Sequence, residues 1–367
     1  MKALPLHQQH QSLGATFQPY GEWEVPLHYG NPQREYEAVH HQAGFADLSP
    51  RGKLLVTGDD RVTWLQSIIS NDLLPLQPGQ GRYSAFMNHK GKMLSYFRVY
   101  LRPDTLFIED VGEVGDATYQ ALRKFLLYGT KAKLQNCLDS WGILLVTGPN
   151  AQELLQRALG VEVGPLQSLD TLSFAWEESQ GFIARTEETG GQDFELFVPI
   201  EALPTLWSKL SNEGKSVGLQ PIGRSALETL RIEAGLARLG SELNETIVPP
   251  EANLEGVAFS LSKGCYPGQE VVARMDTYGS VKRRMVGLVI EGTHQDVPEV
   301  GAKLFSGTRE VGWVSSSTLS PLLQKPIALG FPLRDFTQPD THLEVQIQDH
   351  RFPVSVCPLP FSTPAEV

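Results

Sequence analysis

The chain has 367 residues, 41% hydrophobic and 20% charged, which is typical of a folded globular protein with about two or three domains. Its net charge of -11 argues against broad nucleic-acid binding, because phosphate contacts need clustered lysine and arginine. No apolar run approaches the roughly 20 residues of a membrane helix, and the first residues have no apolar signal core. The three cysteines lie far apart and favour a reducing compartment. We therefore expect a cytoplasmic protein (organelle matrix if eukaryotic) with neither nucleic acid nor membrane as partner.

Two segments in the first two thirds of the chain resemble each other. Residues 54–66 (LLVTGDDRVTWLQ) and 144–156 (LLVTGPNAQELLQ) share their opening LLVTG and their closing LQ. In each copy an apolar run typical of a strand ends at glycine, and Asp59 or Asn150 then begins a helical pattern. We predict two related α+β lobes with a ligand between them. Chance similarity of two strand–helix units is the alternative.

A hairpin and a helix are predicted after each copy of the repeat, because short apolar runs flank turn residues there. These elements are strands over 95–101 and 105–109 with a helix over 113–128, then strands over 182–187 and 193–198 with a helix over 200–210. A further helix is predicted over 221–236, where Ser225 and Glu228 have capping-box spacing and Gly235 suits the residue that ends a helix. Glu233 lies in its last turn, where the helix dipole disfavours a carboxylate, so it is either functional or a solvated surface residue.

From residue 281 onward the pattern changes to short strands separated by Gly, Pro and Asp. We predict a small antiparallel barrel or sandwich of about eighty residues. Its strands are expected over 285–290, 302–305, 310–314, 327–331, 342–348 and 352–357. The boundary is placed near Ser280–Lys282. This gives one domain over 1–281, with lobes over about 35–140 and 141–281, and a second domain over 282–367.

The stretch 262–275 (SKGCYPGQEVVARM) contains a cysteine in a turn-rich setting. A cysteine reacts as the thiolate, and Lys263 is close enough in sequence to favour that form. Pro267 and Gly268 fit the centre of a type II turn. The residues alone leave open whether Cys265 is a working thiol or a small buried apolar residue. Without a CxxC or trusted histidine spacing we predict no metal site within one chain, and a cluster bridged between chains stays open.

The octapeptide KGCYPGQE at 263–270 resembles the signature of the YgfZ-type folate-binding proteins. These are relatives of the glycine-cleavage T-protein, a tetrahydrofolate-dependent aminomethyltransferase. Four further stretches are similar to T-protein segments: 35–58, 71–94, 227–243 and 311–331. The resemblance implies an α+β fold, in which two ferredoxin-like lobes form a folate-binding domain and a small antiparallel β-barrel follows. It also implies tetrahydrofolate, or a one-carbon derivative, as the ligand.

The resemblance further implies residues for the folate site. Glu195, in TGGQDFE, falls where the T-protein family places the glutamate that contacts the pterin, and a carboxylate suits the paired donors of that ring. Glu233 is the second choice for this role. Tyr83 is expected to pack against the folate. Arg231 is expected to bind the dicarboxylate tail. Two other arginines are nearly as good: Arg224 and Arg274.

One departure from the T-protein pattern bears on activity. Ser95 and Tyr96 stand in place of its paired aspartates, and Leu227 stands in place of a basic residue. Neither serine nor tyrosine offers an equivalent charge or proton affinity at neutral pH. These losses argue against aminomethyl transfer, so the sequence leaves enzymatic turnover undecided.

We therefore expect a tetrahydrofolate-binding protein that assists iron–sulfur cluster assembly or repair, with iron–sulfur client or assembly proteins as partners. Cys265 would be its functional thiol at the mouth of the folate pocket. Lys263 would raise the thiolate fraction, and the turn at Tyr266 would direct the thiol. One alternative is a folate-dependent aminomethyltransferase or demethylase that uses a different acid. The other is a non-catalytic folate-binding module.

Overall fold

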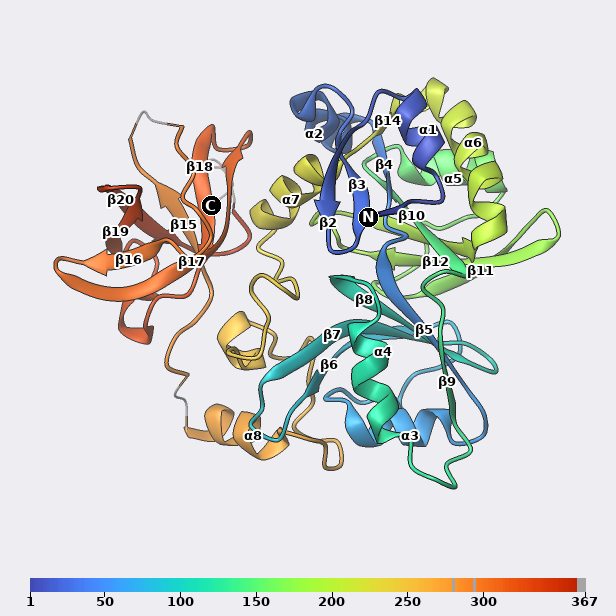
Figure 1. Ribbon diagram of the computed structural model, residues 1–367, viewed down its shortest axis with the longest axis horizontal. Helices are drawn as coiled ribbons and strands as arrows, with labels where there is room; N and C mark the ends of the chain where they lie inside the picture. The colour runs from blue at the N-terminus through green and yellow to red at the C-terminus, as the bar shows by residue number, and fades with distance from the viewer. Residues whose placement is uncertain (279–280, 293–294, 362–367) are drawn as a thin grey trace. The chain divides into compact units, whose positions relative to one another are not determined.

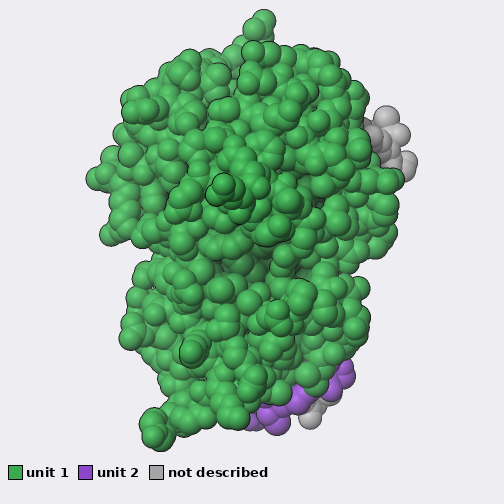
Figure 2. Space-filling model, turned by 90° about the vertical axis from the view of Figure 1, so that its right-hand side faces the viewer, with its two compact units in different colours: residues 1–66, 73–83, 97–227 green, residues 67–72, 84–96, 228–367 purple. Residues whose placement is uncertain are grey.

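The computed structural model describes residues 1–278, 281–292 and 295–361. It consists of two compact units, which Figure 2 shows in different colours. Unit 1 comprises Met1–Gln66, Leu73–Tyr83 and Phe97–Leu227, and unit 2 comprises Ser67–Asp72, Ser84–Tyr96 and Glu228–Val367. The predicted domain boundary near Ser280–Lys282 stays a prediction, and Ser280 lies outside the described residues.

A six-stranded sheet forms one part of unit 1 (Figure 1). Its strands, in spatial order, are β11 (Thr171–Trp176), β12 (Ser179–Thr186), β13 (Asp193–Pro199), β10 (Trp141–Thr147), β4 (Ala43–Asp47) and β14 (Leu219–Pro221). Neighbouring strands run antiparallel, except for the parallel pair of β14 and β4. The hairpin predicted around Gly190 is confirmed as β12 and β13.

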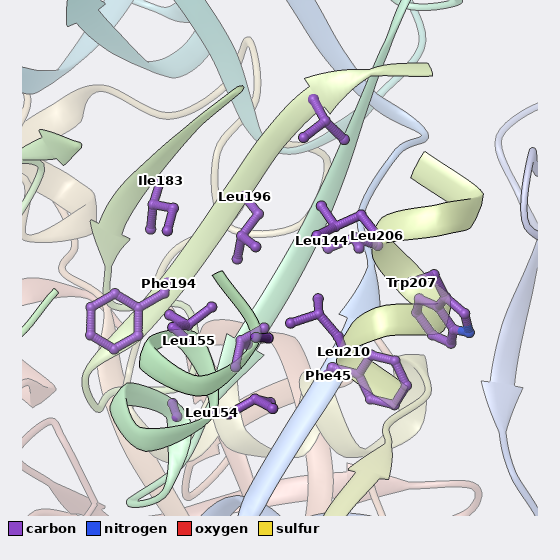
Figure 3. Packing of buried hydrophobic residues seen from close by; sticks show 14 of the residues in the cluster. Phe45, Leu144, Leu154, Leu155, Ile183, Phe194, Leu196, Leu206, Trp207 and Leu210 are labelled. Carbon is purple, nitrogen blue, oxygen red and sulfur yellow. The ribbon is translucent and has the colours of Figure 1, made fainter. Parts of the chain in front are cut away.

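Two helices cover the apolar face of this sheet: α5 (Ala151–Leu159) and α6 (Leu203–Gly214). In α5 the buried residues Ala151, Leu154, Leu155 and Ala158 follow the spacing of one helical face. Figure 3 shows leucines of both helices turned toward leucine, isoleucine and phenylalanine side chains of the strands. The helical pattern predicted to begin at Asn150 and the helix predicted over 200–210 are thus confirmed, and burial of this face stabilises the lobe.

A five-stranded sheet contains the strand of the first copy of the repeat. Its spatial order is β6 (Gly81–Met87), β7 (Met93–Leu101), β8 (Leu106–Val114), β5 (Arg51–Thr57) and β9 (Lys133–Asn136). Helix α3 (Arg61–Ile68) follows β5 as the repeat predicts. The helix predicted over 113–128 is shorter and consists of α4 (Ala117–Leu122) and the 3-10 turn η1 (Arg123–Phe125). The reason is that β8 continues to Val114 and Gly115, with φ of 96°, ends the strand.

The N-terminal residues of unit 1 form elements that the sequence did not predict. A small sheet contains β1 (Lys2–Ala3), β3 (Trp23–His28) and β2 (Thr16–Tyr20), and two helices accompany it, α1 (His7–Ser12) and α2 (Pro32–His41). The short turns η2 (Ile200–Ala202) and η3 (Lys215–Val217) flank α6. Among the described residues, no helix is both long and apolar enough to cross a membrane.

The C-terminal part of unit 2 is a closed antiparallel barrel. Its strands, in spatial order, are β15 (Val286–Ile290), β18 (Lys325–Gly330), β17 (Arg309–Ser320), β16 (Lys303–Ser306), β19 (His342–Ile347) and β20 (His350–Cys357). Alternate apolar residues of these strands fill its core. The predicted barrel is confirmed strand by strand, and with it the α+β fold class.

Three further elements precede or interrupt the barrel: η4 (Pro249–Ala252), α8 (Gln269–Tyr278) and η5 (Arg334–Phe336). Helix α7 (Arg224–Glu233) lies within the range predicted for it. Gly235 has a φ of 69°, the left-handed conformation expected of the residue that ends a helix. Its α-carbon also packs closely on Leu359, where an added Cβ would lie 2.8 Å from that side chain.

Candidate functional site

Glu195, the first choice for contact with the pterin, lies on β13 in unit 1 and its side chain is fully buried. Arg98 from β7 donates from Nη1 to both carboxylate oxygens, at 2.8 Å and 3.0 Å. Arg51 from β5 donates to one of them at 3.3 Å. Three strands from the two sheets therefore bring one carboxylate and two guanidinium groups together inside unit 1.

Two more glutamates complete this group. Glu109 of β8 accepts from Nη1 of Arg51 at 2.8 Å and from Nη1 of Arg98 at 2.9 Å. Glu188, in the turn between β12 and β13, accepts from Nη2 of Arg51 at 2.5 Å and also from Nη2 of Arg98. Both arginines thus direct Nη1 to the two buried glutamates and Nη2 to Glu188. We call Arg51, Arg98, Glu109, Glu188 and Glu195 the arginine–glutamate cluster.

The cluster holds two cations against three carboxyl groups, so its charges do not cancel when all five groups are ionised. Burial raises the pKa of Glu195 well above its usual value, and repulsion from Glu109 and Glu188 adds to this rise. Although burial opposes it, the neighbouring Arg51 and Arg98 lower the pKa of Glu188 to about 2. Burial and repulsion thus favour the protonated form of Glu195, whereas the two arginines favour the ionised form of Glu188.

Tyr83 on β6 lies beside this cluster. The guanidinium carbon of Arg98 is 5.2 Å from the centre of the Tyr83 ring, which is within the range of a cation–π contact. Burial raises the pKa of Tyr83 to about 12, so its hydroxyl stays protonated at neutral pH. The structure thus brings together Tyr83 and Glu195, two of the predicted folate contacts, with Arg98 between them.

The positions of the missing aspartates lie on β7 and belong to unit 2. Ser95 and Tyr96 are both buried, with 0% and 5% of their surface exposed. Among the described residues, Ser95 Oγ has no hydrogen-bond partner.

Arg231 and Glu233 lie on α7 and already have partners within unit 2. Arg231 donates to Glu242 at 2.9 Å and to Glu228 at 2.6 Å, and also to Ser316 Oγ at 2.7 Å. Glu233 accepts from Ser320 Oγ at 2.5 Å. These contacts join α7 to barrel strand β17. The folate roles predicted for the two residues stay predictions.

The two alternative arginines, Arg224 and Arg274, also have partners in the structure. The guanidinium carbon of Arg224 lies 3.3 Å from the centre of the Tyr20 ring, within unit 1. Arg274 on α8 forms an exposed ion pair with Glu270 at 2.7 Å. An exposed pair one helical turn apart contributes little to stability, so the Arg274 side chain is easily released to another anion.

The cysteine loop lies in unit 2, with Cys265 exposed and Lys263 buried. Nζ of Lys263 donates to the main-chain oxygens of Ile69 at 2.6 Å and Asn71 at 3.1 Å. Burial lowers the pKa of Lys263 to about 8. Lys263 therefore fixes the loop to residues 69–71, a structural role that the sequence did not predict. Its effect on the Cys265 thiol stays a prediction.

The turn after Cys265 is held in place by specific contacts. The hydroxyl of buried Tyr266 donates to the Ser260 carbonyl at 3.0 Å. Gly268 has the left-handed φ of 83° that the predicted turn requires. An added Cβ at this glycine would lie 2.7 Å from the Asn88 carbonyl oxygen, so no other residue fits without movement. The loop thus presents Cys265 from a well-anchored backbone.

The predicted site residues fall into two groups, one in each unit. Unit 1 holds Tyr83 and Glu195, and unit 2 holds Arg231, Glu233, Lys263, Cys265 and Tyr266. Sequence reasoning missed Arg51, Arg98, Glu109 and Glu188. One signal could have revealed two of them. Arg98 interrupts the apolar stretch of one predicted strand and Glu109 ends the next, and a buried charge in a strand needs a charged partner.

Comparisons with known proteins agree with this architecture. Residues 6–263 match the family described as the GCVT N-terminal domain, and residues 283–362 match the glycine cleavage T-protein C-terminal barrel domain. A mixed α+β part followed by a closed six-stranded barrel is therefore the architecture of this class. The chain belongs to the glycine-cleavage T-protein family.

Similar proteins match the chain over nearly its full length. An aminomethyltransferase of Corynebacterium aurimucosum is 32% identical over 364 residues, covering 97% of this chain and 97% of the relative. One of a Geobacillus species is 31% identical over 367 residues, covering 98% of both chains. The crystal structure of glycine cleavage system aminomethyltransferase T from Bartonella henselae has a TM-score of 0.88 at 26% identity, covering 98% of each chain.

These comparisons correct the expected function. The predicted role in iron–sulfur cluster assembly is wrong, because the similar curated proteins are named aminomethyltransferase, which was the alternative. Nothing in the comparisons singles out the YgfZ branch or supports iron–sulfur partners. The prediction relied on one octapeptide and one lost carboxylate pair, whereas the similarity extends along the whole chain. Membership of the family bears out tetrahydrofolate as the expected cofactor.

Proposed function

We propose that this chain is a tetrahydrofolate-dependent aminomethyltransferase. The observation that carries the proposal is full-length similarity, at about 30% identity, to proteins named aminomethyltransferase. The residues of unit 1 fit the cofactor. A reduced pterin presents adjacent N–H donors next to a carbonyl acceptor, and a carboxylate beside a guanidinium, here Glu195 beside Arg98, matches both kinds of group.

Each residue of this site has a separate task in the proposal. Glu195, once ionised, accepts from the two pterin donors and fixes the ring orientation. Arg98 holds the Glu195 carboxylate in place, and Tyr83 offers a flat apolar face for ring packing. When bound, tetrahydrofolate supplies the nitrogen that takes up the one-carbon unit. Ser95 and Tyr96 cannot supply a carboxylate, so the protein uses a different acid from the family's aspartates.

Calorimetric titration with tetrahydrofolate tests the binding step. We expect wild type to bind, and Glu195→Gln to bind at least about tenfold more weakly, because the amide replaces an acceptor by a donor facing the pterin. The variant is expected to fold, since loss of one carboxylate leaves the cluster with two cations and two glutamates. Glu201→Gln, an exposed position in the same unit, is the matched control. Absence of binding by wild type contradicts the proposal.

A second candidate is a non-catalytic folate-binding module, which the replacement of both aspartates by Ser95 and Tyr96 favours. Turnover separates the two candidates. An aminomethyltransferase repeatedly transfers the methylene carbon of an aminomethyl thioether donor to tetrahydrofolate, with release of ammonia and the free thiol, whereas a binding module binds folate without release of product. Sustained release establishes the enzyme.

We also propose that the chain belongs to the YgfZ-type branch of the family, on the basis of the KGCYPGQE loop, and that Cys265 acts as a thiol in turnover. Cys265 is exposed on an anchored loop, so Cys265→Ser is expected to fold as wild type and to lower the rate of one-carbon release about tenfold or more. The rate of methylene-tetrahydrofolate release measures this, with Cys357→Ser as control. A wild-type rate for Cys265→Ser removes the thiol role.

We also propose roles for four further residues, a cellular compartment and the domain bounds. Lys263 and Tyr266 position the thiol loop, and Glu233 and Arg231 are candidate contacts of the folate. The chain is proposed to act in the cytoplasm, or in an organelle matrix if eukaryotic. The proposed domains are residues 1–281 and 282–367.

A further inference from the structure

Glu188 is the most exposed member of the arginine–glutamate cluster. Its side chain is 15% exposed, whereas the side chains of Glu195 and Glu109 are 0% exposed and that of Arg98 is 1% exposed. A ligand can therefore contact Glu195 only after a covering group moves. Among the cluster residues, Glu188 is the one that solvent already reaches to the greatest extent.

The backbone around Glu188 is fixed, which leaves its side chain as the part that moves. Asp193 accepts from the Thr189 main-chain nitrogen at 2.6 Å and from the Thr189 hydroxyl at 2.8 Å. Gly190, with a φ of 83°, allows the tight turn between β12 and β13. Rotation of the Glu188 side chain into solvent therefore needs no rearrangement of the two strands.

The charges of the cluster stay balanced after this movement when Glu195 is ionised. Without the Glu188 carboxylate, Arg51 and Arg98 face Glu109 and Glu195, so two cations balance two carboxylates. Loss of repulsion from Glu188 also favours ionisation of Glu195. Departure of Glu188 thus frees two arginine donors in the cluster and favours the charge on Glu195 that the pterin donors require.

Each arginine keeps one free donor direction after Glu188 leaves. Nη2 of Arg51 and Nη2 of Arg98 both point to the two oxygens of Glu188. The N–H donors of two neighbouring guanidinium groups can point to the oxygens of a carboxylate or to a carbonyl oxygen. They accordingly suit either the pterin carbonyl or a carboxylate of the folate tail.

We propose that Glu188 is an internal occupant of the folate site, and that an oxygen acceptor of tetrahydrofolate displaces it from Nη2 of Arg51 and Arg98. This inference rests on the proposed function and names the contact that folate replaces. Glu188 then competes with the ligand for the same donors and sets its affinity.

Titration of Glu188→Gln tests the displacement, with Glu187→Gln as the matched control because Glu187 is the exposed neighbour on the same turn. An amide competes less well than a carboxylate for two guanidinium groups. We expect Glu188→Gln to bind tetrahydrofolate roughly tenfold more tightly than wild type, the difference of about one charge-assisted hydrogen bond. Glu187→Gln is expected to bind as wild type.

Two fragments identify the displacing group. 6-Methyltetrahydropterin carries the pterin carbonyl without a tail, and p-aminobenzoylglutamate carries the tail without a pterin. A gain of affinity in Glu188→Gln for one fragment assigns the acceptor to that fragment. Glu188→Ala, which also removes the amide, is expected to show the same gain and serves if Glu188→Gln does not fold.

The possible failures are distinct. If wild type binds tetrahydrofolate but neither Glu188 variant binds it more tightly, the displacement is overturned and the proposed function stands. If neither wild type nor the Glu188 variants bind tetrahydrofolate, both are overturned. If only the Glu188 variants bind, Glu188 occupies the arginine donors too tightly for tetrahydrofolate to displace it, and the displacement is overturned.

Discussion

Replacement of Arg98 by methionine is expected to lower the free energy of unfolding by about 3–5 kcal/mol, the usual cost of removing one partner of a buried ion pair. Arg98 is 1% exposed and donates to three carboxylates. Without it, Glu109 and Glu195 are left buried with Arg51 as their remaining cation in the cluster. Methionine has a similar length, so the loss reports on charge and hydrogen bonding rather than on a large cavity.

Chemical unfolding, with hydrogen exchange of peptides from β7, β8 and β13, measures this effect. Arg157→Met is the matched control, because Arg157 forms an exposed ion pair with Glu153 at 3.4 Å on α5. Its replacement is expected to lower the free energy of unfolding by at most about 0.5 kcal/mol. The double variant Arg98→Met with Glu195→Gln is expected to recover part of the loss, since it removes the most destabilised carboxylate. A loss below about 1 kcal/mol in Arg98→Met would show that the cluster contributes little to stability.

Much of the fold could be predicted from local patterns. The two LLVTG copies predict the turns from β5 to α3 and from β10 to α5, because a strand, a glycine and an N-cap residue are all local signals. The six barrel strands follow from their alternation and turn residues. Strands β4 and β14 were missed, since both are short and join a sheet formed mainly by distant residues.

The candidate site was harder to predict, because its members come from four separate stretches of the chain. Glu195 was found through a family motif, which the residues around it carry locally. The partners Arg51 and Arg98 were missed, since their pairing with Glu195 spans 144 and 97 residues and depends on how the two sheets of unit 1 are placed. Glu188 was missed for a similar reason. Its role depends on a turn that brings it over the arginines, and no spacing in the sequence shows this.

The function was misjudged for a related reason. The octapeptide around Cys265 and the loss of the aspartates at Ser95 and Tyr96 are both distinctive local features. The predicted function depended on these two features more than on the similarity along the whole chain. The structure shows that part of the octapeptide serves the loop itself. Lys263 fixes it to main-chain oxygens, and Gly268 is required by a close contact with Asn88. Residues of a distinctive motif can thus be required for the structure of a loop as well as for its chemistry.

Replacement of Glu242 by alanine is the second large expected effect, a loss of about 3–5 kcal/mol in the stability of unit 2. Glu242 is fully buried and accepts four hydrogen bonds. One oxygen accepts from Arg231 at 2.9 Å and from the Arg238 main-chain nitrogen at 3.1 Å. The other oxygen accepts from the hydroxyls of Ser315 at 3.0 Å and Ser316 at 2.6 Å. Alanine leaves these donors without their shared acceptor.

Hydrogen exchange separates this effect from that of Arg98, because the two residues belong to different units. In Glu242→Ala we expect faster exchange in peptides of β17 and α7, whereas the unit 1 peptides of β10 and β13 exchange as in wild type. Glu255→Ala is the control, since its exposed pair with Arg284 at 2.9 Å contributes little. Unchanged protection of β17 in Glu242→Ala would mean that the barrel does not depend on this carboxylate. The motif that contains Arg231 and Glu242 would then need another explanation, and contact with the folate tail would be the first to test.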